Sequence, residues 1–196
     1  PPTRPSSVLT GAVLKRRFLI EEQLGRGGMG AVFKARDKRK DEAQDRDPFV
    51  AIKVLNKSFQ EHPQALIALQ REARKAQTLA HPNIVTVYDF DRDGTTVYMT
   101  MELMRGEPLD KIVRRHKDVG LDTDVARAII EQMAEGLAYA HEKRIIHSDF
   151  KPGNVFLTED NRVKVLDFGI ARAVAFQGQD SGEKTVFDAG DLRSLT

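Results

Sequence analysis

Four polar side chains that could perform chemistry lie within about twenty positions of one another in the second half of the chain. Asp149 carries a carboxylate that could accept a proton from a hydroxyl group, and Lys151 carries an ammonium that could face a phosphate. Asn154 and Asp167 add a carboxamide and a second carboxylate, whose oxygens are suitable ligands for Mg²⁺. A proton acceptor, a phosphate-binding cation and a pair of metal ligands together fit phosphoryl transfer.

Short apolar segments separate these polar residues and indicate the structure that holds them. Ile145 and Ile146 precede the first polar loop, the Val-Phe-Leu segment at 155–157 follows it, and the Val-Lys-Val-Leu segment at 163–166 leads to Asp167. Alternation of strand-forming residues with polar loops predicts a small β-hairpin. We therefore expect the polar groups to be held on rigid strand supports.

Two stretches carry a resemblance to a known family. His-Ser-Asp-Phe-Lys-Pro-Gly-Asn at 147–154 and Asp-Phe-Gly at 167–169 resemble the catalytic loop and the magnesium loop of eukaryotic-like (Hanks-type) protein kinases. The lysine two positions after the aspartate resembles serine/threonine kinases rather than tyrosine kinases. Asp-Phe-Gly-Ile-Ala-Arg at 167–172 and Gly-Gly-Met-Gly at 27–30 resemble the bacterial members.

The resemblance implies an ATP- and Mg²⁺-dependent kinase that phosphorylates serine or threonine in a protein substrate. In such an enzyme Asp149 would be the general base or would orient the hydroxyl, and Lys151 would stabilise the transferring phosphoryl group. Asn154 and Asp167 would hold Mg²⁺. Any one of these residues alone could be an ordinary turn or cap residue, so the prediction rests on the set at this spacing.

A glycine-rich loop follows a strand predicted at 18–24. Its Gly-x-Gly-x-x-Gly pattern alone also fits a Rossmann dinucleotide site or an ordinary glycine-rich hairpin. However, Ala-Val-Phe-Lys-Ala at 31–35 predicts a second strand, whereas a Rossmann fingerprint must open a helix. A glycine turn between two strands can lie close over phosphates. We expect nucleotide contacts from Leu24, Gly25, Arg26, Gly27, Gly28, Met29 and Gly30.

Lys53 is a single charge in the apolar strand predicted at 49–55. An unpaired buried ammonium is costly, so Lys53 needs a partner unless its end reaches solvent at a sheet edge. The kinase resemblance supplies the α- and β-phosphates of ATP and a glutamate from the following helix, and implies a catalytic role for both residues. Glu72 matches that glutamate best, with a plain surface charge as the alternative. The helix is predicted at 62–80 from the spacing of Leu66, Leu69, Ala73, Ala76 and Leu79.

The resemblance also implies an adenine pocket between two lobes. Met101 would be the gatekeeper at the back of this pocket. The hinge would read adenine through backbone groups, namely the carbonyl of Glu102 and the amide and carbonyl of Met104. The remaining walls would be Phe156 as the floor, with Val32 and Ala51 as the roof.

The predicted fold is α+β and kinase-like, with a five-stranded antiparallel N-lobe that carries one helix and the start of a mainly helical, incomplete C-lobe. Strands at 84–90 and 95–101 complete the N-lobe, and the charged segment 36–47 is expected to be a solvated loop. The expected domain boundaries are 1–17 for a linker or edge segment, 18–101 for the N-lobe, 102–104 for the hinge and 105–196 for the partial C-lobe.

Two helices are expected in the C-lobe. A short one runs from Gly106 to about His116. A long one begins at caps within 121–124 and ends near 141–143. Its apolar face would consist of Val125, Ile129, Ile130, Met133, Leu137 and Ala140.

Composition excludes several other functions. The 196-residue chain has 31 basic and 29 acidic side chains, and this balance does not fit a nucleic-acid-binding surface. The absence of cysteine excludes disulfides, thiolate catalysis and Cys-ligated zinc, and is compatible with the cytoplasm, where we expect the protein. No apolar run reaches the roughly 18 residues of a membrane helix.

Two departures from the family pattern matter. Ser148 stands where many relatives have an arginine that grips a phosphate, which predicts weaker dependence on activation-loop phosphorylation at Thr185 or Ser194. Residues 173–195 resemble an activation segment, but the Ala-Pro-Glu anchor and the later helices are missing from the sequence. We therefore expect a piece of a longer protein whose uncovered apolar surface favours self-association.

Three functions compete. A protein serine/threonine kinase is favoured by the glycine loop, Lys53 and Lys151. The alternative is a nucleotide-binding fragment or pseudokinase scaffold without activity. A small-molecule kinase of related fold fits less well.

Overall fold

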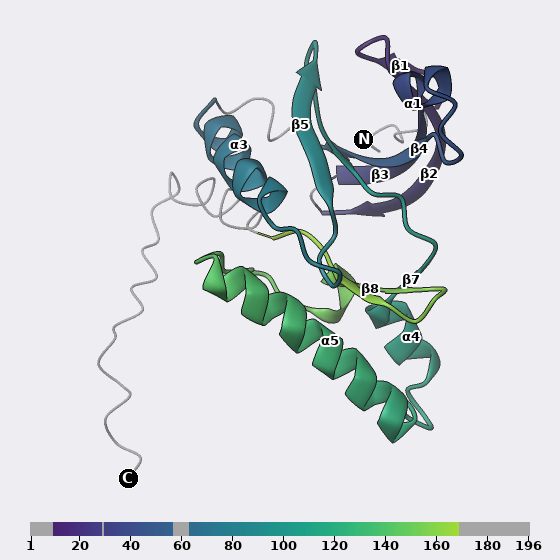
Figure 1. Ribbon diagram of the computed structural model, residues 1–196, viewed down its shortest axis with the longest axis vertical. Coiled ribbons are helices and arrows are strands. Elements are labelled where there is room, and N and C mark those ends of the chain that lie inside the picture. Colours follow the sequence, from purple (N-terminus) through teal and green to yellow (C-terminus); the bar gives the residue numbers. More distant parts are fainter. Residues whose placement is uncertain (1–9, 29, 57–62, 169–196) are drawn as a thin grey trace, which may run out of the picture.

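The computed structural model describes residues 10–28, 30–56 and 63–168, without the side chains of residues 63–66, 68 and 69. In Figure 1 a curled sheet with helix α3 at its side lies above helices α4 and α5 and a second, small sheet. The expected α+β architecture, an antiparallel N-lobe followed by part of a helical C-lobe, is confirmed. Met29, Gly169 and the activation segment expected at 173–195 lie outside the described residues.

The larger sheet is antiparallel, with the strand order β1-β2-β3-β4-β6-β5. Side chains alternate between its two faces, as the period of a strand requires. Ile52 packs on one face with Phe33 and Tyr98, whereas Ala51 packs on the other with Met99. The strands are β1 (Val13–Leu14), β2 (Phe18–Gly27), β3 (Gly30–Asp37), β4 (Phe49–Leu55), β5 (Val87–Asp93) and β6 (Thr96–Met101).

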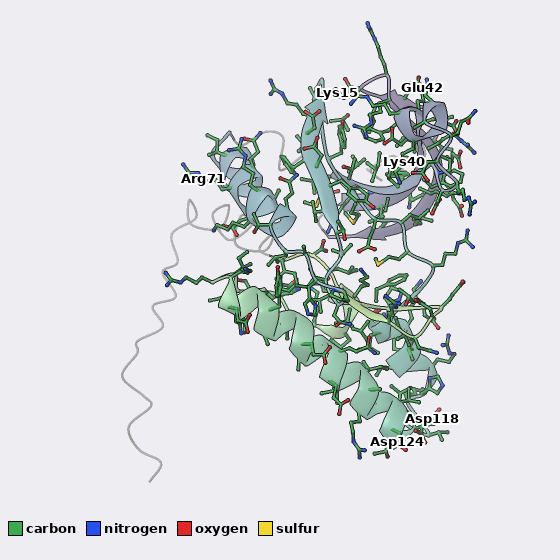
Figure 2. All side chains as sticks on the ribbon, in the orientation of Figure 1. Lys15, Lys40, Glu42, Arg71, Asp118 and Asp124 are labelled. Carbon is green, nitrogen blue, oxygen red and sulfur yellow. The ribbon has the colours of Figure 1, made fainter. Side chains whose placement is uncertain are left out.

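The strand β1 adds a sixth strand to the five expected, in a region assigned to a linker. Leu14 pairs with Phe18 and is buried, so this short segment belongs to the sheet. Lys15 follows at the top of the sheet in Figure 2, where its ammonium pairs with Asp91 at 3.2 Å. Its amide donates a hydrogen bond of 2.7 Å to Asp93. The turn after β1 is thus tied to the β5–β6 turn.

A short helix, α1 (Lys38–Glu42), corrects the solvated loop expected at 36–47. Asp37 caps it by accepting a hydrogen bond from the Arg39 amide at 3.1 Å. None of its five residues is buried. Without an apolar face it has no periodic signal in the sequence, and the cap is its only local mark.

Helix α3 (Pro63–Gln77) covers the sheet face that carries Ala51, and its own Ala73 and Ala76 are buried there. Leu79, just beyond the helix, packs in a separate cluster with Ile84. The predicted helix is therefore confirmed over 63–77, while the side chains of Leu66 and Leu69 lie outside the described part.

The smaller sheet joins β7 (Gly106–Pro108), β8 (Val155–Thr158) and β9 (Val163–Val165), and its β8–β9 hairpin is the one predicted. Strand β7 is a correction, because a helix was expected to begin at Gly106. A Cβ at Gly106 would overlap the carbonyl oxygen of Leu157, so pairing with β8 requires glycine there. Helix α4 (Leu109–Arg115) begins only after this strand.

Helix α5 (Thr123–Glu142) has the predicted ends, with Asp122 as the N-cap that accepts hydrogen bonds from two amides. Ile129 and Ala140 are buried as expected, but Val125 and Ile130 are 48% and 58% exposed, so that part of the predicted apolar face is wrong. Gly136 explains the orientation, because its bare backbone lies against the carbonyl oxygen of Asn83. No described helix is long and apolar enough to cross a bilayer.

An ion pair with a buried carboxylate joins the residue before β2 to the last residue of β3. Arg17 donates two hydrogen bonds to Asp37, at 2.8 and 2.6 Å, and Asp37 is only 1% exposed. Burial alone would raise the pKa of Asp37, but the hydrogen bonds from Arg17 and from the Arg39 amide bring that pKa below its ordinary value.

The pH dependence of stability should carry this signature. Because the pKa of Asp37 is lower in the folded chain, the pair stabilises the fold above the unfolded-state pKa of about 3.9, and this stabilisation is lost as the pH falls through the folded-state value. Denaturation of Asp37→Asn should show a loss of about 2–3 kcal/mol at pH 7 relative to the original chain. That difference should shrink steadily below about pH 4.

The exposed variant Asp45→Asn serves as the control and should change the unfolding free energy at pH 7 by less than about 0.5 kcal/mol. A difference between Asp37→Asn and the original chain that stays constant down to pH 2 would contradict the ion-pair explanation.

Candidate functional site

Asp149 lies in the loop that follows α5, where two polar groups contact its carboxylate. Lys151 Nζ donates to Oδ2 at 2.6 Å and Asn154 Nδ2 donates to the same oxygen at 3.2 Å. Asn154 Nδ2 also donates to the Asp149 carbonyl oxygen at 2.8 Å. The hydrogen bond from Lys151 is the main cause that lowers the pKa of Asp149. Asp149 is thus ionised near neutral pH and can accept a proton.

His147 holds this loop in place. The sequence analysis quoted this residue but gave it no role. It is 2% exposed and its Nε2 lies 2.6 Å from the Leu166 carbonyl oxygen, while Nδ1 accepts from the Asp149 amide at 3.3 Å. These partners assign the proton to Nε2 in a neutral ring, and burial lowers the pKa of His147 accordingly. Its ring also packs against Phe168, with centroids 4.8 Å apart.

Lys53 and Asp167 form an ion pair across the two lobes. Lys53 Nζ lies 2.6 Å from Asp167 Oδ2, and the lysine side chain is only 9% exposed. Lys53 is on the face of β4 that α3 covers, and Asp167 follows β9 with a φ of +60°. Residues 114 positions apart therefore meet at one point, a pairing that the sequence analysis did not predict.

Glu72 has a different partner from the one expected. Its Oε1 accepts a hydrogen bond of 2.7 Å from Lys75, one turn along α3. Among the described residues no ion pair joins Glu72 to Lys53; Asp167 is the carboxylate that neutralises this ammonium. The expected Lys53–Glu72 pair is absent from this conformation. The turn at Asp167 places the Asp167 carboxylate against the Lys53 ammonium instead.

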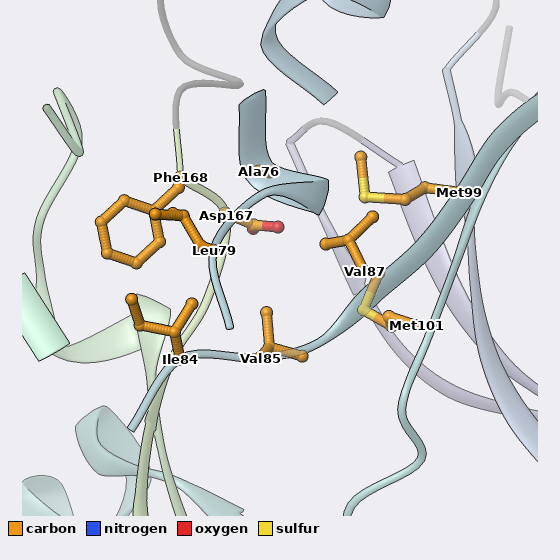
Figure 3. Close-up of a pocket in the computed structure, with 9 residues that line it drawn as sticks. All are labelled: Ala76, Leu79, Ile84, Val85, Val87, Met99, Met101, Asp167 and Phe168. Carbon is orange, nitrogen blue, oxygen red and sulfur yellow. The ribbon is translucent and has the colours of Figure 1, made fainter. Parts of the chain in front are cut away.

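A small cavity of about 10 Å³, near the lower limit for one water molecule, lies between α3 and the sheet (Figure 3). Among the described residues that line it, Asp167 is the only ionisable one, and its carboxylate points between the apolar side chains. The lining consists of Ala76, Leu79, Ile84, Val85, Val87, Met99, Met101, Asp167 and Phe168.

The residues expected around adenine come together only in part. Met101 and Ala51 are register partners in β6 and β4, and Val32 and Met104 pack against the same cluster. Phe156 lies on β8 opposite Lys164, outside the apolar clusters of the described residues. Leu166 packs on the cluster instead, a contact that the sequence analysis did not identify.

The glycine-rich loop divides into two kinds of glycine. A Cβ at Gly30 would overlap the carbonyl oxygen of Val54, so β3–β4 pairing explains that residue. Gly25, Gly27 and Gly28 have no atom within 4 Å of an added Cβ and do not have positive φ. Nothing in the described chain requires them to be glycine, so open space above this loop is available to a ligand. Leu24 and Arg26 in the same loop are also exposed or partly exposed.

Asn154 and Asp167 are the two residues expected to hold Mg²⁺. The Leu166 amide donates to the Asn154 carbonyl oxygen at 2.9 Å, which holds the two residues on adjacent segments. The described residues contain no group of three or more acidic or histidine ligands. Two protein oxygens supplemented by phosphates and water is the arrangement that Mg²⁺ usually adopts, so the residues fit this ion.

Comparison with known proteins shows which family of sequences this chain resembles. The protein kinase domain family model matches residues 18–188. A probable serine/threonine-protein kinase of Clostridium acetobutylicum is 37% identical over 84% of this chain and 24% of its own length. For PknA of Mycobacterium tuberculosis the values are 36%, 84% and 37%, and for PknB of Mycolicibacterium smegmatis they are 40%, 84% and 26%.

A solved structure shares the fold. The kinase domain of Mycobacterium tuberculosis PknI matches with a TM-score of 0.71 and 26% identity, over 82% of this chain and 61% of that one. The chain spans between 24% and 37% of the length of the curated relatives named in the preceding paragraph.

Removal of Lys53 should leave the Asp167 carboxylate without a partner in a largely buried place. We expect Lys53→Met to lower the free energy of unfolding by about 2–3 kcal/mol. Lys75→Met is a matched control with an ion pair of nearly the same length, at 2.7 Å, but 51% exposed, and should cost less than about 0.5 kcal/mol. Urea denaturation of the chain without nucleotide would measure both.

The double variant Lys53→Met/Asp167→Asn removes both charges and should recover more than half of the loss. Equal losses for Lys53→Met and Lys75→Met would show that the buried pair does not have the assigned role.

Proposed function

The chain belongs to the protein kinase family, and we propose that it transfers the γ-phosphoryl group of ATP to serine and threonine hydroxyls of proteins. The observation that carries the proposal is the position of Asp149, whose carboxylate is ionised, hydrogen-bonded to Lys151 and Asn154, and fixed through His147 to the strand that leads to Asp167. The serine/threonine kinases among the relatives support the choice of acceptor.

In this proposal Asp149 accepts the proton of the substrate hydroxyl, or orients that hydroxyl, as the hydroxyl oxygen attacks phosphorus. Lys151 contacts the same carboxylate at 2.6 Å, so its ammonium lies where negative charge on the transferring group can be stabilised. The contribution of Asn154 is twofold, because its amide nitrogen binds Asp149 and its amide oxygen is left for a metal.

Lys53 and Asp167 join the N-lobe part of the proposed nucleotide site to its C-lobe part. We assign Lys53 to the α- and β-phosphates and Asp167, with Asn154, to Mg²⁺. When bound, Mg²⁺ neutralises charge on the phosphate oxygens. In the conformation described, the ammonium and the carboxylate neutralise each other at 2.6 Å. With Mg·ATP bound, Lys53 would instead contact phosphates and Asp167 would instead hold the metal.

Glu72 is assigned as the residue that holds Lys53 once Asp167 turns to the metal. Glu72 and Lys53 both lie at the α3 face of the sheet. The present partner of Glu72, Lys75, is 51% exposed and easily replaced. Adenine is assigned to the space beside the hinge, between Val32 and Ala51 on one side and Phe156 on the other. Because the reaction consumes ATP, the proposal places this domain in the cytoplasm.

The alternative is a nucleotide-binding domain without phosphoryl transfer. Phosphorylation of a small molecule is less favoured, because the named relatives are protein kinases.

The first test is transfer of label from γ-labelled ATP with Mg²⁺ to the chain itself and to a generic protein substrate. Asp149→Asn keeps the shape but cannot accept a proton, and should reduce transfer by about 10²–10⁴-fold. Mg·ADP affinity should change by less than about threefold, because Asp149 contacts the hydroxyl and not the nucleotide.

Label that persists undiminished in Asp149→Asn would contradict the assignment of the general base. No label in the original chain, with Mg·ADP still bound, would favour the alternative of a nucleotide-binding domain.

The open glycines give a second test. A Cβ added at Gly27 has no atom of the described chain within 4 Å. The variant Gly27→Val should therefore change the free energy of unfolding by less than about 0.5 kcal/mol. Mg·ATP affinity measured by calorimetry should fall by about tenfold or more, because the new side chain occupies the space assigned to phosphates.

Gly30→Ala is the contrasting variant and should lower stability by about 1–3 kcal/mol, because its Cβ meets the backbone of Val54. If Gly27→Val bound nucleotide as tightly as the original chain, the phosphates would not lie over this loop.

A further inference from the structure

A second ion pair between the lobes has no role in the chemistry described above. Lys164 on β9 places its Nζ 2.8 Å from Glu102 Oε1, in the hinge. The two side chains are 14% and 23% exposed. Most ion pairs of the described residues are far more exposed, so this one is unusual in holding two charges at a largely dry place.

Glu102 uses the same oxygen for a further contact. Its Oε1 accepts a hydrogen bond of 2.7 Å from the Thr86 amide, while the Glu102 amide donates to the Thr86 carbonyl oxygen at 3.0 Å. These two bonds form a closed ring between the hinge and the segment that leads into β5. The side chain and the backbone of Glu102 are therefore both bonded to the same residue, Thr86.

Lys164 orients that side chain. Its ammonium also lies 3.4 Å from the Ile84 carbonyl oxygen, so one cation joins the hinge, the segment before β5 and strand β9. Lys164 stands only three residues before Asp167, and the intervening Val165 is completely buried. Strand β9 is thereby connected both to the hinge, through Lys164, and to the carboxylate that pairs with Lys53, through the chain.

We propose that Lys164 is a positioning residue, which through Glu102 holds the hinge backbone at a fixed distance from the β8–β9 hairpin that carries Asn154 and Asp167. The inference deepens the proposed function, because the hinge is where adenine is expected and the hairpin is where Mg²⁺ is expected. Lys164 itself contacts neither the nucleotide nor the transferred group. Its effect is preorganisation of the site, so that nucleotide binding does not first have to order the hinge.

Hydrogen exchange of the full 196-residue chain without nucleotide is the first test. Lys164→Met removes the ammonium but keeps an unbranched side chain, and should speed exchange of the hinge amides at 102–104 by about five- to tenfold. Lys164→Arg should restore most of the protection, since a guanidinium can also donate to Glu102.

Lys34→Met is the matched control, because Lys34 is also a strand lysine in an ion pair, with Glu21 at 3.6 Å, but the two side chains are 29% and 28% exposed and neither belongs to the hinge or to β9. Hinge exchange should not change in this variant. Unchanged hinge exchange in Lys164→Met, or an equal increase in Lys34→Met, would overturn the proposal.

Nucleotide affinity is the second readout. The KM for ATP in Lys164→Met should rise by about five- to tenfold with kcat changed less than about twofold, since binding and not chemistry is affected. Glu102→Gln should give a similar rise, and the double variant should be no worse than either single one. An increased kcat in Lys164→Met would overturn the proposal and would indicate that the pair restrains the enzyme instead.

Failure of the proposed function would look different. If the original chain neither binds Mg·ADP nor transfers phosphate, the kinase proposal fails, and hydrogen exchange alone then decides whether Lys164 holds the hinge.

Discussion

The backbone of two successive residues, Val165 and Leu166, holds the described structure together. Each of their four backbone polar groups is hydrogen-bonded to a different residue: the Val165 amide and carbonyl at 2.8 and 3.0 Å, and the Leu166 amide and carbonyl at 2.9 and 2.6 Å. Val165 is completely buried, so either of its own two backbone groups left unpaired would cost about 1–3 kcal/mol. The partners, in the same order, are Asn83, Val85, Asn154 and His147.

The catalytic geometry depends on this backbone. The partners of Val165 belong to the segment that leads into the large sheet, whereas those of Leu166 belong to the catalytic loop. The next residue, Asp167, has a φ of +60°, which turns its carboxylate back toward β4. Such a backbone angle is uncommon for a residue with a side chain, and it persists where neighbouring bonds leave no alternative. The position of the Asp167 carboxylate is thus decided by hydrogen bonds that the carboxylate itself does not make.

The same constraint explains how much the sequence alone could predict. The β8–β9 hairpin and the ends of α5 were predictable because alternation and caps are local signals. β7 was not, because Gly106 is required by the carbonyl oxygen of Leu157, which is fifty-one residues away. Nor could the sequence decide which carboxylate pairs with Lys53: Asp167 and Glu72 are both suitable, and the choice depends on a backbone angle at Asp167.

The strongest argument for function comes from residues that the fold does not need. Gly30 and Gly106 have a structural reason, since a Cβ at either would overlap a neighbouring strand. Gly25, Gly27 and Gly28 have none in the described chain, although glycine in a strand or turn costs conformational entropy on folding. A costly residue type without an internal contact to justify it is best explained by a ligand that approaches the backbone closely. The buried Lys53–Asp167 pair below the sheet then supplies the charges that such a ligand, a nucleotide with its metal, would need.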